Sequence, residues 1–147
     1  MAEQTQALKL LSEGRDVFVW FPTGYGKSLC YQLLPFLIDY KLGRTNAPLV
    51  DRSVVLVVSP LVCLMIDQVR SLKSRGVSAA ILSSNRGIDK GLVTTPTEMS
   101  SGKYRLLYTA LKAVIEDHSW RMLLLEPPLS SLLVAMAVDE AHCVHKW

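Results

Sequence analysis

The stretch Pro22-Thr23-Gly24-Tyr25-Gly26-Lys27-Ser28 joins an apolar run, Val17–Phe21, to a helix-like segment that ends at Tyr40. We expect the apolar run to be a buried strand, so that strand, glycine-rich turn, Lys-Ser and helix follow one another as in a phosphate-binding loop. The glycines let backbone N–H groups converge on an anion, Lys27 adds a full charge, and the Ser28 hydroxyl can bind Mg²⁺. Phenylalanine replaces the first glycine of the general pattern. The segment predicts a nucleoside triphosphate site, with an ordinary strand-to-helix turn as the alternative.

Apolar runs alternate with amphipathic stretches along the rest of the chain. Further strands are predicted at Val54–Ser59, Ala79–Leu82, Arg105–Thr109 and Leu132–Val138. Helices are predicted at Ser28–Tyr40, Leu61–Ser74, Ala110–Asp117 and Trp120–Leu125, and surface loops at Lys41–Ser53 and Ser83–Gly102. This alternation is typical of βαβ units. We therefore predict one α/β domain over residues 1–147, with a parallel sheet covered by helices on both faces.

The composition bounds the class of protein. The chain has 147 residues, half of them apolar, and a net charge of +3 from 16 basic and 13 acidic residues. This mild excess permits contact with nucleic acid without indicating it, and the scattered basic residues, Arg44 and Arg105 among them, are predicted to be solvated. The three cysteines are predicted to be buried free thiols in a reducing compartment. We recognise no signal peptide, and Glu126-Pro127-Pro128 interrupts the longest apolar region, so we expect a soluble intracellular protein without membrane contact.

A second signal follows the last predicted strand, in Val138-Asp139-Glu140-Ala141-His142. The carboxyl ends of parallel strands meet at one edge of a sheet, so Asp139 and Glu140 are expected beside the glycine-rich turn. There the first carboxylate could hold Mg²⁺, and the second could orient and deprotonate an attacking water. An acidic pair after a strand is a weak signal by itself, since strand ends are often polar. Together with residues 22–28 it predicts hydrolysis of a nucleoside triphosphate.

Several motifs, in order, resemble those of RecQ-family DNA helicases of superfamily 2. Asp139-Glu140-Ala141-His142 followed by Cys143-Val144 resembles the second motor motif of that family, and residues 22–32 resemble its nucleotide loop. Residues 57–69 resemble a segment that contacts the DNA backbone, and residues 102–110 resemble the strand before its Thr-Pro-Glu turn. The resemblance covers nearly the whole chain. It implies a parallel-sheet P-loop NTPase fold, the first RecA-like motor domain of a helicase that moves 3′ to 5′ on single-stranded DNA with ATP and Mg²⁺.

The resemblance also assigns roles to individual positions. ATP would be bound by Gln4, Pro22, Thr23, Gly24, Tyr25, Gly26, Lys27 and Ser28, with Gln4 reading the adenine edge. Ser28 and Asp139 would hold Mg²⁺, Lys27 and Glu140 would act in catalysis, and His142 would couple the nucleotide site to DNA. DNA would meet Ser59, Pro60, Gln68 and Trp147, with phosphates at the helix N-terminus after Pro60. A solvated helix face is the alternative for Gln68.

Some positions depart from the family pattern. Ala110-Leu111-Lys112 stands where the family has Thr-Pro-Glu, and residues 144–147 differ from its Val-Ser-Gln-Trp. The resemblance implies a further strand between those at 17–21 and 132–138, so the domain is expected to stop before the strand of its third motif. It also implies a second motor domain, whose arginine finger would contribute about 10³–10⁵ in rate. We therefore expect residues 1–147 alone to hydrolyse ATP negligibly and not to unwind DNA.

Three functional hypotheses remain from the sequence. The first is part of a RecQ-like DNA helicase, which would be located in the nucleus or on the chromosome in a eukaryote. The second is a non-catalytic remnant that binds nucleotide or nucleic acid weakly. The third is part of a DEAD-box-type RNA helicase, against which Leu29-Cys30-Tyr31-Gln32 and Cys143 speak. Loss of ATP-dependent thermal stabilisation in a Lys27→Ala variant would separate a real nucleotide site from a remnant without one.

Overall fold

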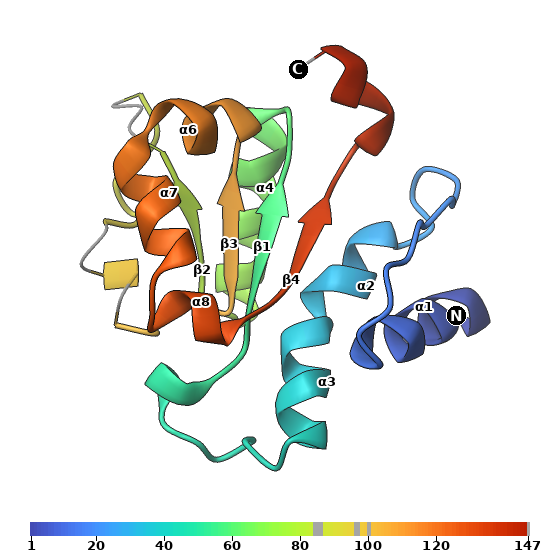
Figure 1. Cartoon of the computed structure of the whole chain (residues 1–147). Coiled ribbons are helices and arrows are strands. Elements are labelled where there is room, and N and C mark those ends of the chain that lie inside the picture. Colours follow the sequence, from blue (N-terminus) through green and yellow to red (C-terminus); the bar gives the residue numbers. More distant parts are fainter. Residues whose placement is uncertain (84–86, 96–97, 100, 147) are drawn as a thin grey trace.

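The computed structural model describes residues 1–83, 87–95, 98–99 and 101–146, and a parallel β-sheet lies at its centre (Figure 1). The strands are β1 (Val54–Val58), β2 (Ala79–Leu82), β3 (Leu106–Thr109) and β4 (Leu133–Val138). They lie in the order β2-β3-β1-β4, and every pairing is parallel. All of β1 is buried, because it has a strand on each side and helices over both faces. The α/β parallel-sheet prediction is confirmed.

Helices cover both faces of this sheet (Figure 1). They are α1 (Ala2–Ser12), α2 (Lys27–Gln32), α3 (Leu34–Lys41), α4 (Val62–Ser74), α6 (Leu111–Glu116), α7 (His118–Leu125) and α8 (Leu129–Leu132), with short 3₁₀ helices η1 (Leu49–Asp51) and η2 (Ala141–Lys146). Val55 and Val57 of β1 face a core built with α2, α3 and α4. Val54 and Leu56 face a second core built with α7 and α8. The period-two alternation of a strand thus fills two apolar layers, and none of the helices in the described ranges has the length and apolar character to cross a membrane.

The predicted helix Ser28–Tyr40 is in fact two helices, α2 and α3, which meet at Leu33. Pro35 occupies the second position of α3. It has no N–H to donate to the carbonyl one turn earlier, and its ring crowds that carbonyl, so a proline is tolerated in a first turn but not inside a helix. The expectation of one continuous helix was wrong for this reason. The loop predicted at Ser83–Gly102 lies partly outside the described residues.

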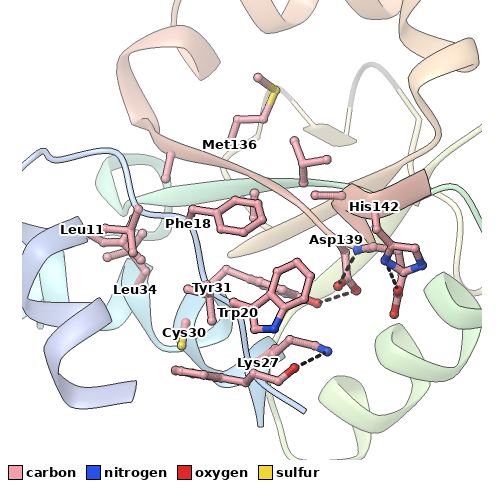
Figure 2. Close-up of a pocket in the computed structure, with 18 of the residues that line it drawn as sticks. Leu11, Phe18, Trp20, Lys27, Cys30, Tyr31, Leu34, Met136, Asp139 and His142 are labelled. Atoms are coloured by element: carbon pink, nitrogen blue, oxygen red, sulfur yellow. Dashed lines mark hydrogen bonds and ion pairs between the residues drawn. The ribbon is translucent and has the colours of Figure 1, made fainter. Parts of the chain in front are cut away.

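The apolar run Val17–Phe21 is not a strand, which corrects the prediction made from its composition. Residues 15–22 have no regular secondary structure, and Phe18 and Trp20 are 75% and 82% exposed. A strand needs a partner for its N–H and C=O groups, and within the described residues β4 pairs with β1 alone. A cavity of about 520 Å³ lies between the run and β4, with Phe18, Trp20 and Met136 in its lining (Figure 2). The run therefore borders the sheet without joining it.

The cysteines differ from one another in burial. Cys30 is buried, Cys143 is partly buried, and Cys63 is exposed in the first turn of α4. The prediction of three buried thiols was therefore wrong for Cys63. Burial raises the pKa of the Cys30 thiol, although a hydrogen bond to the backbone opposes this rise. A buried thiol with a raised pKa is unreactive at neutral pH.

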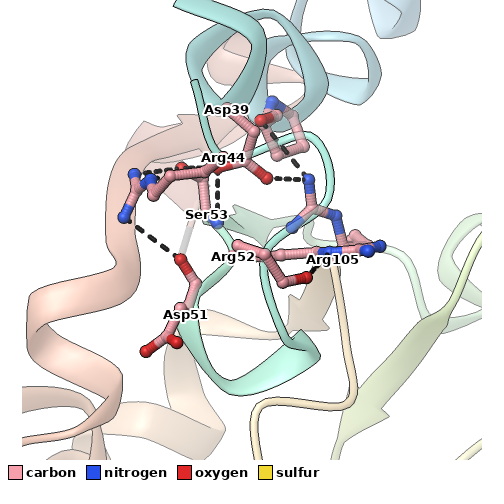
Figure 3. A network of polar contacts seen from close by, with 8 residues as sticks. Asp39, Arg44, Asp51, Arg52, Ser53 and Arg105 are labelled. Atoms are coloured by element: carbon pink, nitrogen blue, oxygen red, sulfur yellow. Dashed lines mark hydrogen bonds and ion pairs between the residues drawn. The ribbon is translucent and has the colours of Figure 1, made fainter. Parts of the chain in front are cut away.

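Asp39 on α3 is the centre of a buried polar network (Figure 3). Its carboxylate accepts hydrogen bonds from the Ser53 N–H at 3.0 Å, from the Ser53 hydroxyl at 2.7 Å, and from Arg105 Nη2. Arg44 Nε lies 3.6 Å from the same carboxylate. Ser53 and Arg105 directly precede β1 and β3, so the network ties α3 to the edge of the sheet where these strands begin. Arg105 is only 5% exposed, which corrects the expectation that the basic residues are solvated.

We expect Asp39→Asn to destabilise the fold by about 3–5 kcal/mol at neutral pH, because Arg105 would keep a buried charge without its partner. Burial raises the pKa of Asp39, but hydrogen bonds from Ser53 and Arg105 outweigh burial and bring the pKa below its usual 3.8. Stability from a lowered carboxyl pKa is present above the unfolded value and is lost as the pH falls through the folded value. The difference in urea-unfolding free energy between wild type and variant should therefore shrink below pH 3.8.

The matched control for this prediction is Asp51→Asn, which changes an exposed carboxylate in η1. We expect it to alter the unfolding free energy by less than about 0.5 kcal/mol. An Asp39→Asn effect of the same small size, or one that does not change with pH, would contradict the role given to Asp39.

Candidate functional site

The loop Pro22–Gly26 turns the chain from the apolar run into α2. Gly24 and Gly26 have φ angles of 81° and 78°, in the left-handed region that glycine adopts without strain. The Tyr25 N–H closes a turn on the Pro22 carbonyl at 3.2 Å, and α2 begins immediately after Gly26. Lys27 Nζ donates to the carbonyl of Phe21 at 3.1 Å. The glycine-rich turn and the helix start are therefore present where the sequence predicts them, although the strand before them is not.

The acidic pair lies at the carboxyl end of β4, facing the same cavity as Lys27 (Figure 2). The Asp139 N–H donates to the Val58 carbonyl at 2.8 Å, and Asp139 Oδ1 accepts from the Glu140 N–H at 3.1 Å. Glu140 has a φ of 52°, the one positive φ at a non-glycine residue in the described ranges, which costs roughly 1–2 kcal/mol. Backbone strain of this kind concentrates at functional sites.

Glu140 and His142 are in direct contact. Glu140 Oε2 lies 3.3 Å from His142 Nδ1, and the His142 side chain is 71% exposed whereas that of Glu140 is 31% exposed. A carboxylate next to an imidazole can be held in one orientation by it. The arrangement places the predicted base and the predicted coupling residue side by side, with the imidazole on the solvent side.

A polar network beneath the loop is centred on Gln68 of α4. Its Oε1 accepts hydrogen bonds from Tyr31 OH at 3.1 Å, Gln32 Nε2 at 2.9 Å and Tyr108 OH at 3.0 Å. Burial raises the pKa of Tyr108 to about 12 and also raises the pKa of Tyr31. Both hydroxyls therefore keep their protons at neutral pH and remain donors.

The other end of the same amide faces the two predicted metal ligands. Gln68 Nε2 lies 3.4 Å from Ser28 Oγ and 3.5 Å from Asp139 Oδ2. Tyr31 OH lies 3.2 Å from the same carboxylate oxygen. Residues from α2, α4 and β4, far apart in the sequence, thus converge on one point below the loop.

Gln4 on α1 contacts the glycine-rich loop. Its Nε2 donates to the Tyr25 carbonyl at 2.6 Å. Its Oε1 is buried and has no hydrogen-bond partner among the described residues. A buried amide oxygen without a partner is costly, and a donor such as the exocyclic amino group of adenine would satisfy it. The base-reading role of Gln4 stays a prediction.

The residues expected to contact DNA do not converge on one point as the predicted nucleotide-site residues do. Ser59 is 2% exposed and its hydroxyl has no hydrogen-bond partner in the part of the chain that the structure describes, whereas Pro60 is partly exposed. Gln68 is partly buried with its amide engaged as described, so the alternative of a solvated helix face was wrong. Trp147 lies outside the described residues.

Sequence reasoning did not single out Tyr31 or Tyr108, and it did not foresee the inward orientation of Gln68. One signal was available for Gln68, since it falls between Met65 and Val69 on the buried face of α4. A polar side chain on an apolar helix face needs a hydrogen-bond partner inside the protein. The identity of that partner depends on how α2, β3 and β4 meet, which local patterns do not contain.

Ser28 and Asp139 fit a magnesium ion, because Mg²⁺ prefers oxygen ligands and usually takes one or two from the protein and the rest from water and substrate phosphates. Across residues 1–83, 87–95, 98–99 and 101–146, no group of three or more His, Cys, Asp and Glu side chains could hold a metal ion. Phosphate oxygens of a bound nucleotide would therefore have to complete such a site.

Comparisons with known proteins agree on one class. The sequence model of the DEAD/DEAH box helicase family matches residues 1–147. The chain is similar to the ATP-dependent helicase SGS1 of Saccharomyces cerevisiae, with 35% identity over 144 residues, 98% of this chain and 9% of that protein. It is also similar to the ATP-dependent DNA helicase RecQ of Haemophilus influenzae (31% over 144 residues, 98% of this chain and 20% of that protein) and to the probable ATP-dependent DNA helicase RecS of Bacillus subtilis (32% over 146 residues, 98% and 25%). The chain thus spans a quarter or less of the length of these relatives.

Proposed function

Because this chain belongs to the DEAD/DEAH box helicase family and RecQ-type helicases are among its relatives, we propose that it is the ATP-binding part of the first motor domain of a 3′–5′ DNA helicase. One observation carries the proposal. Lys27 and Asp139 line the same cavity, and Ser28 and Asp139 meet at the amide nitrogen of Gln68. This is the combination of cation, hydroxyl and carboxylate that a nucleotide with its metal requires.

The proposed nucleotide lies across the loop. Its phosphates contact the N–H groups of residues 24–28 and the ammonium group of Lys27, and its adenine amino group donates to the unpaired Oε1 of Gln4. Mg²⁺ bound to Ser28 and Asp139 would neutralise charge on the β- and γ-phosphates. Lys27 would leave its present partner, the Phe21 carbonyl, for a phosphate oxygen, since a charged acceptor forms the stronger hydrogen bond.

Glu140 is the proposed general base. Its carboxylate takes a proton from a water whose oxygen bonds to the γ-phosphorus while the bond to the ADP leaving group breaks. His142, 3.3 Å away, orients that carboxylate and offers an exposed face through which bound DNA could act. An arginine finger from a second motor domain would contribute about 10³–10⁵ in rate, so we expect residues 1–147 alone to hydrolyse ATP negligibly.

The proposed DNA contact is the start of α4. Leu61, Val62 and Cys63 are exposed there, and the first N–H groups of this 13-residue helix have no partner within the helix. They would bind phosphates of a single strand without reading bases. Because Ser59 is buried, we assign this contact to the backbone of the first turn and to Pro60 rather than to the Ser59 hydroxyl. Trp147 remains a further proposed contact.

We expect the chain to bind a short oligothymidylate with a Kd on the order of 10⁻⁴ to 10⁻⁶ M, weakening as salt is raised. Cys63→Asp should weaken this binding at least about threefold, because a negative charge in the first turn repels phosphates while favouring the helix itself. Fluorescence anisotropy with labelled oligonucleotides measures both effects.

Ser131→Asp on α8 is the matched control, since it adds the same charge at an exposed position near the start of β4. Equal affinities of wild type and Cys63→Asp would contradict the proposed DNA contact. Tighter binding of an RNA of the same length would favour the RNA-helicase alternative.

A second candidate is a chain that binds nucleotide without being part of a motor. It is favoured because residues 17–21 pair with no strand within the described ranges, so that α2 and α3, and not a strand, connect the loop to the sheet. Both candidates predict that Lys27→Ala loses its ATP-dependent thermal stabilisation. Only the motor-domain candidate predicts binding of single-stranded DNA at the start of α4.

A further inference from the structure

Gln68 lies about two turns into α4, yet its amide points toward the phosphate loop. Its Oε1 receives donors from α2 and β3 at 2.9 to 3.1 Å. These donors orient the amide, because the oxygen must face them and the N–H₂ group must then face the other way. In that direction lie Ser28 Oγ and Asp139 Oδ2, at 3.4 and 3.5 Å.

The two N–H bonds of one amide nitrogen can address two oxygen acceptors at once. The two acceptors here are the oxygens that fit Mg²⁺, and they come from α2 and from the residue that follows β4, which are far apart in the sequence. The distance between these two oxygens therefore depends on a side chain that contacts both of them. Tyr31 OH lies 3.2 Å from the carboxylate oxygen and also forms a side-chain hydrogen bond with Ser28, but its single proton serves one acceptor at a time. Gln68 Nε2 has two N–H bonds and lies within 3.5 Å of both oxygens.

We infer that Gln68 is a positioning residue for the metal site, which holds Ser28 Oγ and Asp139 Oδ2 at the spacing that Mg²⁺ needs when nucleotide binds. The inference rests on the proposed function and adds to it a residue that touches neither nucleotide nor metal. Outer partners that orient metal ligands typically change metal affinity by about 10–100-fold when they are removed. The rigid hydrogen bonding at Oε1 is what gives the amide its fixed orientation.

A purely structural role would give a different pattern of effects. If Gln68 only filled the space between α2, β3 and α4, removing any of its partners would weaken the fold and the site alike. If Gln68 positions the metal ligands, its removal must weaken the response of nucleotide binding to Mg²⁺ and leave the binding of metal-free nucleotide unchanged. Tyr108 provides the comparison, because it donates to the same Oε1 at 3.0 Å and hydrogen-bonds to neither metal ligand in the described part of the chain.

The test measures binding of a fluorescent ATP analogue to the chain over a range of Mg²⁺ concentrations, for wild type, Gln68→Met and Tyr108→Phe. Gln68→Met keeps the length and removes both ends of the amide. We expect its half-maximal Mg²⁺ concentration to rise about 10–100-fold, with metal-free nucleotide affinity unchanged within about twofold. Tyr108→Phe removes one donor to Oε1 but leaves Gln32 and Tyr31 to orient the amide, so it should leave both quantities within about twofold of wild type. Thermal unfolding of each protein reports the structural cost separately.

If Gln68→Met lacks a cooperative unfolding transition, Gln68→Asn decides the question. It keeps an amide but is one methylene too short to reach Ser28 and Asp139 together, so the same rise is expected. A folded variant with an unchanged Mg²⁺ response would overturn the inference, as would an equal rise in Tyr108→Phe. A wild-type chain that binds the analogue but does not respond to Mg²⁺ would overturn the metal site of the proposed function, and the role of Gln68 with it.

Discussion

Lys27→Ala is expected to abolish the thermal stabilisation that ATP and Mg²⁺ give to this chain. A ligand present at 100 times its Kd stabilises the folded state by about 2.7 kcal/mol, which corresponds to a rise in Tm of roughly 5–10 °C for a domain of this size. Lys27 supplies the full positive charge beside the loop, and its Nζ is held near the phosphate position by the Phe21 carbonyl at 3.1 Å. Without it the phosphates lose their charged partner. Differential scanning fluorimetry with increasing ATP measures the change.

The control is Lys112→Ala, which removes a lysine that is 80% exposed on α6 and pairs only loosely with Glu116 at 3.7 Å. It should leave the nucleotide-dependent rise in Tm unchanged. A Lys27→Ala protein that is folded and is still stabilised by ATP as strongly as wild type would show that the nucleotide binds elsewhere.

Asp139→Asn is expected to remove most of the effect of Mg²⁺ on nucleotide affinity, a loss of at least about tenfold, or about 1.4 kcal/mol. The amide keeps the shape of the side chain and can still accept from Tyr31, so the fold should persist. It no longer carries the negative charge that a divalent cation requires. Removing a negative charge near the phosphates should also make metal-free nucleotide bind as tightly as before or more tightly. Titrations of a fluorescent ATP analogue with and without Mg²⁺ measure both effects.

Asp67→Asn is the matched control, because Asp67 is an exposed carboxylate on α4, next to Gln68 in the sequence. Its Mg²⁺ response should equal that of wild type. An Asp139→Asn protein that responds normally to Mg²⁺ would remove Asp139 from the metal site.

Most of the sheet could be predicted because its strands have recognisable local sequence patterns. The strands β1 to β4 are apolar runs bounded by polar or turn-forming residues. Burial on both faces explains the composition of β1, β2 and β3, whereas β4 is partly exposed. The glycine-rich turn could also be predicted from the sequence, since Gly24 and Gly26 adopt φ values that other residues rarely take. The phosphate loop and the acidic pair were predicted from residue types and from the rule that strand ends share an edge.

Other features depend on partners that a local pattern does not name. Val17–Phe21 has the composition of a strand, but within the described residues no strand pairs with it, and a strand exists only with a partner. The burial of Arg105 follows from Asp39, which is 66 residues away in the chain. The orientation of Gln68 follows from Tyr31 and Tyr108, on elements that meet it only in the folded molecule.

The central claim is that ATP with Mg²⁺ binds between the loop and the end of β4, and amide hydrogen exchange of the wild-type chain tests it most directly. With saturating ATP and Mg²⁺, we predict slower exchange of the N–H groups of Gly24–Leu29 and of Glu140, with no change in α6 and α7. The same experiment without Mg²⁺ should retain protection of the loop and lose that of Glu140. Unchanged exchange at Gly24–Leu29, under conditions in which bound nucleotide is measured independently, would contradict the claim.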